Sequence, residues 1–147
     1  MSLESCLSAL ETTLASVGGL DASHVSQNNY KILGLGGSCF AVVRPGYFIQ
    51  NPWDMGGGYK LQWMSSIELF SKFDAQLPGS AQAHLSTLAY RVMGTVLAKP
   101  DLGTADVWFA EITSGAAPEE VFTPEGRGPM FLMQSLACKI VEGTTVA

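Results

Sequence analysis

Charged residues are scarce in this chain of 147 residues. They make up 14% of the sequence, whereas a typical globular domain holds about 25%. Hydrophobic residues account for 47%. Because a monomer needs charged surface to remain well solvated, this shortage indicates that other subunits cover part of the surface. A monomer with an unusually apolar surface is the alternative.

Clusters of basic residues are also missing. The eight Lys and Arg residues are dispersed along the chain, and the formal net charge is −5. The sequence therefore lacks the positive patch with which proteins grip nucleic-acid phosphates. This acidic balance argues against tight DNA binding, but it is compatible with lining a passage through which DNA slides.

Cysteine is rare, and Cys6, Cys39 and Cys138 lie far apart. An odd number at wide spacing indicates buried free thiols in a reducing compartment. The first residues include Glu4 and lack the positive leader of a signal peptide. No apolar run approaches the roughly 18 residues of a membrane span. We therefore expect a cytosolic protein without a membrane partner.

Catalytic and metal-binding motifs are absent as well. The only histidines are His24 and His84, and the glycines at 34–37 fit neither the dinucleotide fingerprint nor the Walker loop. We therefore expect no metal, no cofactor and no enzymatic activity. Two alternatives stay open, a pair of Cys39 with His24 in space or a pair of loop carboxylates. The available carboxylates are Glu111, Glu119, Glu120 and Glu125.

The strongest positive signal is the run Tyr59–Phe73, which alternates between apolar and polar residues. The apolar set is Tyr59, Leu61, Trp63, Ile67, Leu69 and Phe73, and the polar set is Lys60, Gln62, Ser66, Glu68 and Lys72. This period of two predicts a strand with one buried and one solvated face. A strand of fifteen residues would span roughly 50 Å. An average strand holds only about five or six residues. Part of the strand should project as an arm, or the strand should bend.

Helical periodicity appears twice. Residues 2–17 place Leu3, Leu7, Leu10, Leu14 and Val17 on one stripe, and residues 80–99 do the same with Leu85, Leu88, Ala89, Val92, Val96 and Leu97. Ser80 is expected to cap the second helix, and Pro100 to end it. Further strands are predicted at 38–44, 105–113 and 130–141, and no internal repeat stands out. This order predicts an α+β fold, a mostly antiparallel sheet with one N-terminal helix and one long helix packed on it.

We expect residues 1–147 to form a single domain with long interaction loops at about 18–37, 45–58 and 114–129. A short strand is possible at Tyr30–Leu33 within the first loop. Large apolar side chains in glycine-rich loops are typical of interfaces. The candidate interface residues are Trp53, Met55, Trp63 and Phe122.

The order of elements resembles the tail terminator (tail completion) proteins of long-tailed bacteriophages and their head–tail joining relatives. The matching features are the helix Ser2–Val17, the long strand Tyr59–Phe73, the helix after Leu77-Pro78-Gly79, and the strands Ala105–Thr113 and Met130–Val141. The likeness covers nearly the whole chain, but it is a pattern of elements and lengths without a catalytic signature.

The resemblance implies a homo-hexameric ring that terminates the tail tube and joins it to the head or neck. The expected partners are the tail tube protein and a head–tail connector protein, with DNA passing through the lumen without specific binding. Such a protein is assembled in the host cytoplasm and resides in the virion. The alternatives are another neck or head-closure adaptor protein and, from a different class, a small cytosolic enzyme or ligand-binding domain.

Overall fold

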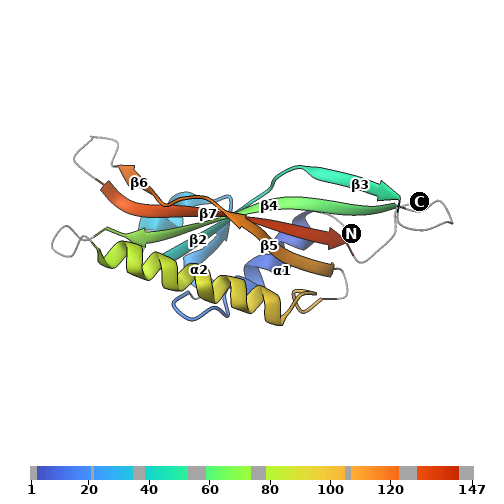
Figure 1. Ribbon diagram of the computed structural model, residues 1–147, viewed down its shortest axis with the longest axis horizontal. Helices are drawn as coiled ribbons and strands as arrows, with labels where there is room; N and C mark the ends of the chain where they lie inside the picture. Colours follow the sequence, from blue (N-terminus) through green and yellow to red (C-terminus); the bar gives the residue numbers. More distant parts are fainter. Residues whose placement is uncertain are drawn as a thin grey trace.

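The computed structural model of the chain shows the predicted α+β fold (Figure 1). It describes residues 3–20, 22–34, 39–52, 59–73, 79–104, 107–122 and 129–142. Within these ranges, seven strands form one sheet, ordered β1-β2-β4-β7-β5, with β3 also paired to β4 and β6 to β7. The strands are β1 (Val25–Gln27), β2 (Cys39–Arg44), β3 (Phe48–Pro52), β4 (Tyr59–Lys72), β5 (Val107–Gly115), β6 (Glu119–Phe122) and β7 (Pro129–Glu142). The β1–β2 pair is parallel, and the other pairs are antiparallel.

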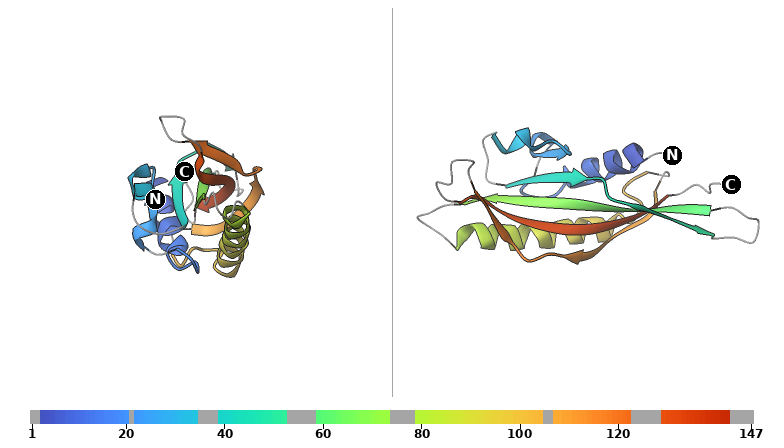
Figure 2. Two further views of the ribbon diagram at one scale, coloured as in Figure 1. Left: turned by 90° about the vertical axis from the view of Figure 1, so that its left-hand side faces the viewer. Right: turned by 90° about the horizontal axis from the view of Figure 1, so that it is seen from above.

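Two long hairpins make up most of the sheet. β2 and β3 follow one another along the same edge of β4, and β5 and β6 do the same along β7. β4 and β7 pair antiparallel at the centre, with Ile67 opposite Leu136, so the hairpin ends point in opposite directions (Figure 2). α1 (Leu3–Leu14) comes before the first hairpin and α2 (Ser80–Ala98) before the second. The topology thus repeats although the sequence does not.

Both helices pack on one face of the sheet through the predicted apolar stripes. Leu10 and Leu14 of α1 and Leu85 and Val92 of α2 are fully buried against the strands. Leu97 is the exception, because it is 81% exposed. At about 100° per residue, Val96 lies about 20° around the helix from the buried Leu85, whereas Leu97 lies about 120° from it and so falls outside the buried stripe. The predicted Ser80 cap is also wrong, since the N-cap is Gly79 and has no side-chain hydrogen bond.

The second face of the sheet is not solvated at its centre, contrary to the expectation for β4. Phe40, Val42, Phe70 and Phe131 form a separate buried cluster there, and Glu68 is buried beside it. The segment 22–34 folds back over this face and packs Ile32 and Leu33 on the cluster. Period-two alternation identified the strand correctly. The face that we expected to be exposed to solvent is buried, because a segment from elsewhere in the chain covers it.

The expected loops hold more regular structure than predicted. The loop at 18–37 contains β1 and two 3₁₀ helices, η1 (Ala22–His24) and η2 (Tyr30–Gly34), so the possible strand at 30–33 is wrong. The loops at 45–58 and 114–129 contain β3 and β6. Cys6 and Cys138 are buried, Cys39 is half-buried, and none of these three cysteines forms a disulfide bond. Neither α1 nor α2 has the length and hydropathy of a membrane-crossing helix, and no other helix in the described ranges does.

Candidate assembly surface

A bulge starts the projecting part of the first hairpin. Between the pairs Arg44–Ser66 and Phe48–Trp63, three residues of one strand oppose two of β4. A Cβ atom on Gly46 would lie 1.7 Å from the carbonyl oxygen of Met64, so this close backbone approach requires glycine. The Met64 N–H donates to the carbonyl oxygen of Tyr47 at 2.8 Å and closes the bulge. Bulges bend and twist a strand, and here the neighbour along this edge of β4 changes from β2 to β3.

Three consecutive apolar side chains are exposed just after this bulge. We call Tyr47, Phe48 and Ile49 the β3 ridge; they are 63%, 57% and 40% exposed. The hairpin of β3 and β4 extends beyond both helices in Figure 1. The ridge lies at the base of this hairpin, where β4 still pairs with β7 on its other edge: Phe48 lies opposite Trp63, and Trp63 lies opposite Ile140. Large apolar side chains exposed side by side are typical of a surface that a partner covers.

Trp63 joins this hairpin to the body of the protein. Its indole Nε1 donates to the Glu142 Oε1 atom at 2.8 Å, and Glu142 is only 1% exposed. The Trp63 ring lies against Phe48, with 5.3 Å between the ring centroids. Trp63 also packs against the main hydrophobic core. Trp63 is therefore the half-buried support of the ridge. Sequence reasoning found Trp63 but not the ridge that it carries.

The other predicted interface residues are not placed by the structure. Trp53 and Met55 lie outside the described residues, and Phe122 ends β6 without a described side chain. Their assignment to an interface stays a prediction. The ridge itself could have been found from the sequence, because three large apolar residues directly follow the turn signal Pro45-Gly46.

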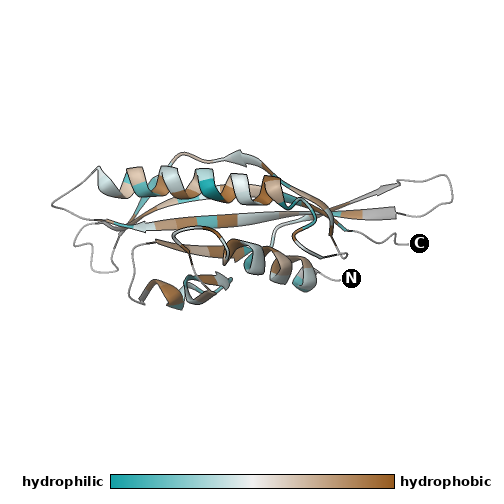
Figure 3. Cartoon of the chain, turned by 90° about the horizontal axis from the view of Figure 1, so that it is seen from below, coloured by the Kyte–Doolittle hydropathy of each residue, from teal (hydrophilic) through white to brown (hydrophobic). Residues whose placement is uncertain are grey.

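A second exposed apolar surface lies on α2 and was missed by sequence reasoning. Tyr90, Met93 and Leu97 recur at steps of three and four on one side of the helix, and they are 79%, 40% and 81% exposed. Hydrophobic and hydrophilic residues alternate along α2 in Figure 3. The sequence did contain a signal for this surface, because the helix holds more apolar residues than one buried stripe can accommodate.

Beside this stripe runs a groove of about 250 Å³ between α2 and β5, which we call the α2–β5 groove. It is lined by Met93, Val96, Leu97, Pro100, Phe109, Ala110, Glu111 and Ile112. Glu111, the one ionisable residue of this lining, forms an ion pair with Lys139 at 3.1 Å. The groove is thus mainly apolar, and the charge of Glu111 is already paired with Lys139 of the same chain.

A polar cluster fastens the segment 22–34 to the second face of the sheet. The Tyr30 hydroxyl donates to the Glu68 Oε1 atom at 2.5 Å, and Arg44 lies 3.6 Å from the same oxygen. Arg44 also lies over the Tyr30 ring, 6.0 Å from its centroid. Partial burial, and then the Glu68 carboxylate, raise the pKa of Tyr30. The three groups satisfy one another, so this cluster acts as a clasp.

The two residues of the first catalytic alternative, Cys39 and His24, pack in different surroundings. His24 packs its ring on Phe40, 4.9 Å between centroids, whereas the neighbouring Cys39 packs against the main core. Because successive strand residues point to opposite faces, the structure puts Cys39 and His24 on different faces of the sheet. Instead, Cys39 and His84 line one hollow of about 240 Å³, next to Arg91.

The candidate carboxylates that the structure describes lie in different settings. Glu111 is paired with Lys139, and Glu119 and Glu120 are exposed neighbours on β6 that point to opposite faces. Glu125 lies outside the described residues. In the part of the chain that the structure describes, no three His, Cys, Asp or Glu residues come together as metal ligands.

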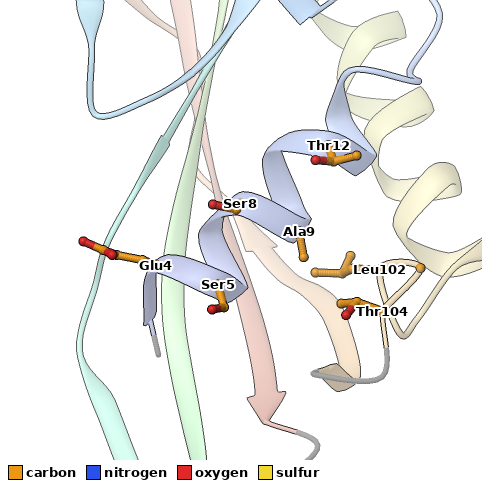
Figure 4. A pocket seen from close by; sticks show the side chains of 8 residues that line it. Glu4, Ser5, Ser8, Ala9, Thr12, Leu102 and Thr104 are labelled. Atoms are coloured by element: carbon orange, nitrogen blue, oxygen red, sulfur yellow. The ribbon is translucent and has the colours of Figure 1, made fainter. Parts of the chain in front are cut away.

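One further hollow, of about 540 Å³, lies between α1 and the turn at 102–104. Figure 4 shows Ala9 of α1 facing Leu102 and Thr104, while Glu4 points away from the turn. Ser5, Ser8 and Thr12 complete its hydroxyl-rich lining on α1. Glu4 is the one charged residue of this lining, so the hollow has the character of an open polar surface.

Comparison with models of known protein families gives no match, and comparison with curated proteins gives none either. Function is therefore argued from the geometry of the β3 ridge, the α2–β5 groove and the hollow at Cys39.

Proposed function

We propose that this chain is a virion structural protein that assembles into a ring, terminates a phage tail tube and joins it to the head or neck. The observation that carries this proposal is the β3 ridge, three exposed apolar side chains on a hairpin that extends beyond the helices. A monomer would expose this surface to water, whereas an assembly would bury it.

The remaining features are compatible with this role. The resemblance in the order of elements implies a homo-hexamer that contacts the tail tube protein on one side and a head–tail connector on the other. Six copies at −5 each would carry about −30 in total, which would discourage DNA from adhering to the lumen. No DNA-binding, metal or cofactor role is needed.

Native mass spectrometry of the purified protein, with electron micrographs of the same sample, tests the proposal. We expect a closed oligomer, six copies if the resemblance holds, and ring-shaped particles. Virions that contain the chain should show it at the junction of tail and head. A strictly monomeric species in both samples would refute ring formation, and a position elsewhere in the neck would favour a head-closure adaptor.

The hollow shared by Cys39 and His84 favours a second candidate function, a small enzyme or ligand-binding domain. An imidazole that activates a thiol accelerates its alkylation. For this candidate, iodoacetamide should label Cys39 several-fold more slowly in the His84→Ala variant, with buried Cys6 and Cys138 as unreactive internal controls. Equal labelling rates would remove this candidate.

A further inference from the structure

We propose that the β3 ridge of one copy docks into the α2–β5 groove of a second copy, so that the chains join head to tail. This inference rests on the proposed ring and names the contact that would build it. The occupant of the groove is thus a second copy of this chain. The inserted side chains are Tyr47, the most exposed residue of the ridge, and Ile49, whereas Phe48 points to the opposite face of β3 from Ile49 and packs against Trp63.

The positions of the two surfaces favour a head-to-tail contact. The ridge lies on the first hairpin, which extends past the helices (Figure 1). The groove lies along the C-terminal half of α2. A contact between two different surfaces repeats with every added subunit and closes into a ring when the rotation allows it. Ridge packed on ridge would leave the groove uncovered.

The charges of the two surfaces are compatible. No Asp, Glu, Lys, Arg or His lies among residues 45–49. In the groove, Glu111 already has Lys139 of its own chain at 3.1 Å. Docking would therefore bury no unpaired charge, which is the largest obstacle to covering an apolar surface.

The amount of exposed apolar surface fits one interface between copies. The large exposed apolar residues of the contact are Tyr47 and Ile49 on the ridge and Met93 and Leu97 in the groove. Taking roughly 150–250 Å² for a large side chain, their exposed fractions present on the order of 450 Å². An interface of standard size buries about 1,600 Å² in total, of which somewhat more than half is apolar. These four side chains alone supply about half of that apolar share.

Two single variants test the contact. Tyr47→Asp places a charge on the ridge and leaves the groove intact, whereas Leu97→Asp places a charge in the groove and leaves the ridge intact. Both side chains are more than 60% exposed, so each variant should fold as the wild type does by circular dichroism. We expect each variant alone to be monomeric by native mass spectrometry at a concentration where the wild type forms rings.

An equal mixture of the two variants is the decisive measurement. The ridge of the Leu97→Asp chain can still enter the groove of the Tyr47→Asp chain, but the resulting pair has no intact surface left. We therefore expect a mixed dimer of one copy of each variant, and no larger species. Ala83→Asp, an exposed change near the other end of α2, is the matched control and should form rings like the wild type.

The outcomes separate this inference from the proposed function. A wild-type chain that stays monomeric contradicts the ring itself. Rings in the wild type and in both Asp variants would overturn the docking contact while leaving the ring in place. The docking contact would also be overturned if the variants are monomeric but their mixture gives no dimer, or if rings persist and only binding to a tail tube protein is lost.

Discussion

At the residue scale, the contact between Trp63 and Glu142 decides how firmly the projecting hairpin is held. The two residues are 79 positions apart, and their hydrogen bond crosses from β4 to the end of β7. Glu142 is almost completely buried. A buried carboxylate that loses a donor is strongly penalised, so this single bond stabilises both the strand end and the support of the ridge.

Replacing Trp63 by Phe should lower the free energy of unfolding by about 1.5–3 kcal/mol, because the buried Glu142 carboxylate loses its indole donor. Urea unfolding measures this loss. The slope of the unfolding free energy against urea concentration should be the same in the variant and the wild type. A double-mutant cycle with Glu142→Leu separates the hydrogen bond from the smaller ring volume. A coupling energy near zero would show that the bond contributes nothing.

The buried thiol of Cys138 gives a prediction for alkaline pH. Burial, and then the Glu111 carboxylate, raise the pKa of Cys138 from 9.0 to about 12. Above pH 9 the unfolded chain therefore loses a proton that the folded chain keeps, so stability falls as pH rises. The slope approaches about 1.4 kcal/mol per pH unit.

Urea unfolding at several pH values between 9 and 10 checks this slope. Tyr30 also has a raised pKa and acts in the same direction above pH 10, so the comparison stays below that value. Cys138→Ala should be less stable than the wild type at neutral pH but should decline less steeply. Parallel declines of the two proteins would contradict the assignment.

At the element scale, the regular elements with strong periodicity were predictable from the sequence. The stripes of α1 and α2, and the alternation of Tyr59–Lys72, each extend over ten or more residues and needed no knowledge of partners. β1, β3 and β6 are only three to five residues long and lie among glycines and prolines. Their strand character comes from pairing with β2, β4 and β7, which a local pattern does not contain.

The bulge at Gly46 is an element feature that a single methyl group should disrupt. Gly46→Ala would place a Cβ atom 1.7 Å from the Met64 carbonyl oxygen, so β3 and β4 must separate there. We expect a loss of about 3 kcal/mol or more in the free energy of unfolding, measured by urea unfolding.

Gly94→Ala is the matched control for this change. Gly94 lies inside α2, and a Cβ atom there meets no other atom within 4 Å. Alanine favours the helix over glycine, so this variant should gain about 0.5–1 kcal/mol. Similar effects of the two alanine substitutions would mean that the bulge tolerates a side chain.

At the scale of the whole molecule, the two helix–hairpin halves give the chain two ends with different surfaces. The first hairpin carries the exposed β3 ridge, and the exposed part of β6 in the second carries Glu119 and Glu120. The sequence predicted a surface that needs partners from its shortage of charge. It could not predict where the ridge and the groove lie on the surface, because the positions of Tyr47 and Leu97 depend on how β3, β5 and α2 pack.

Ionic strength should reveal what kind of force holds the copies together. Each copy carries −5, so association brings like charges together and repulsion opposes it. The ridge is uncharged, and the groove holds Glu111 already paired within its own chain, so salt has no ion pair between copies to weaken. We therefore expect a rise from about 0.05 M to about 0.5 M NaCl to favour the larger species, since the Debye length falls below about 10 Å above 0.1 M.

Sedimentation velocity at one protein concentration measures this shift. Leu97→Asp should remain monomeric at every salt concentration, because screening removes repulsion but does not restore an apolar groove. Ala83→Asp adds the same charge on an exposed part of α2 and should follow the wild type with rising salt. Dissociation of the wild type as salt rises would mean that ionic contacts hold the assembly, and the ridge and groove would then not be its principal interface.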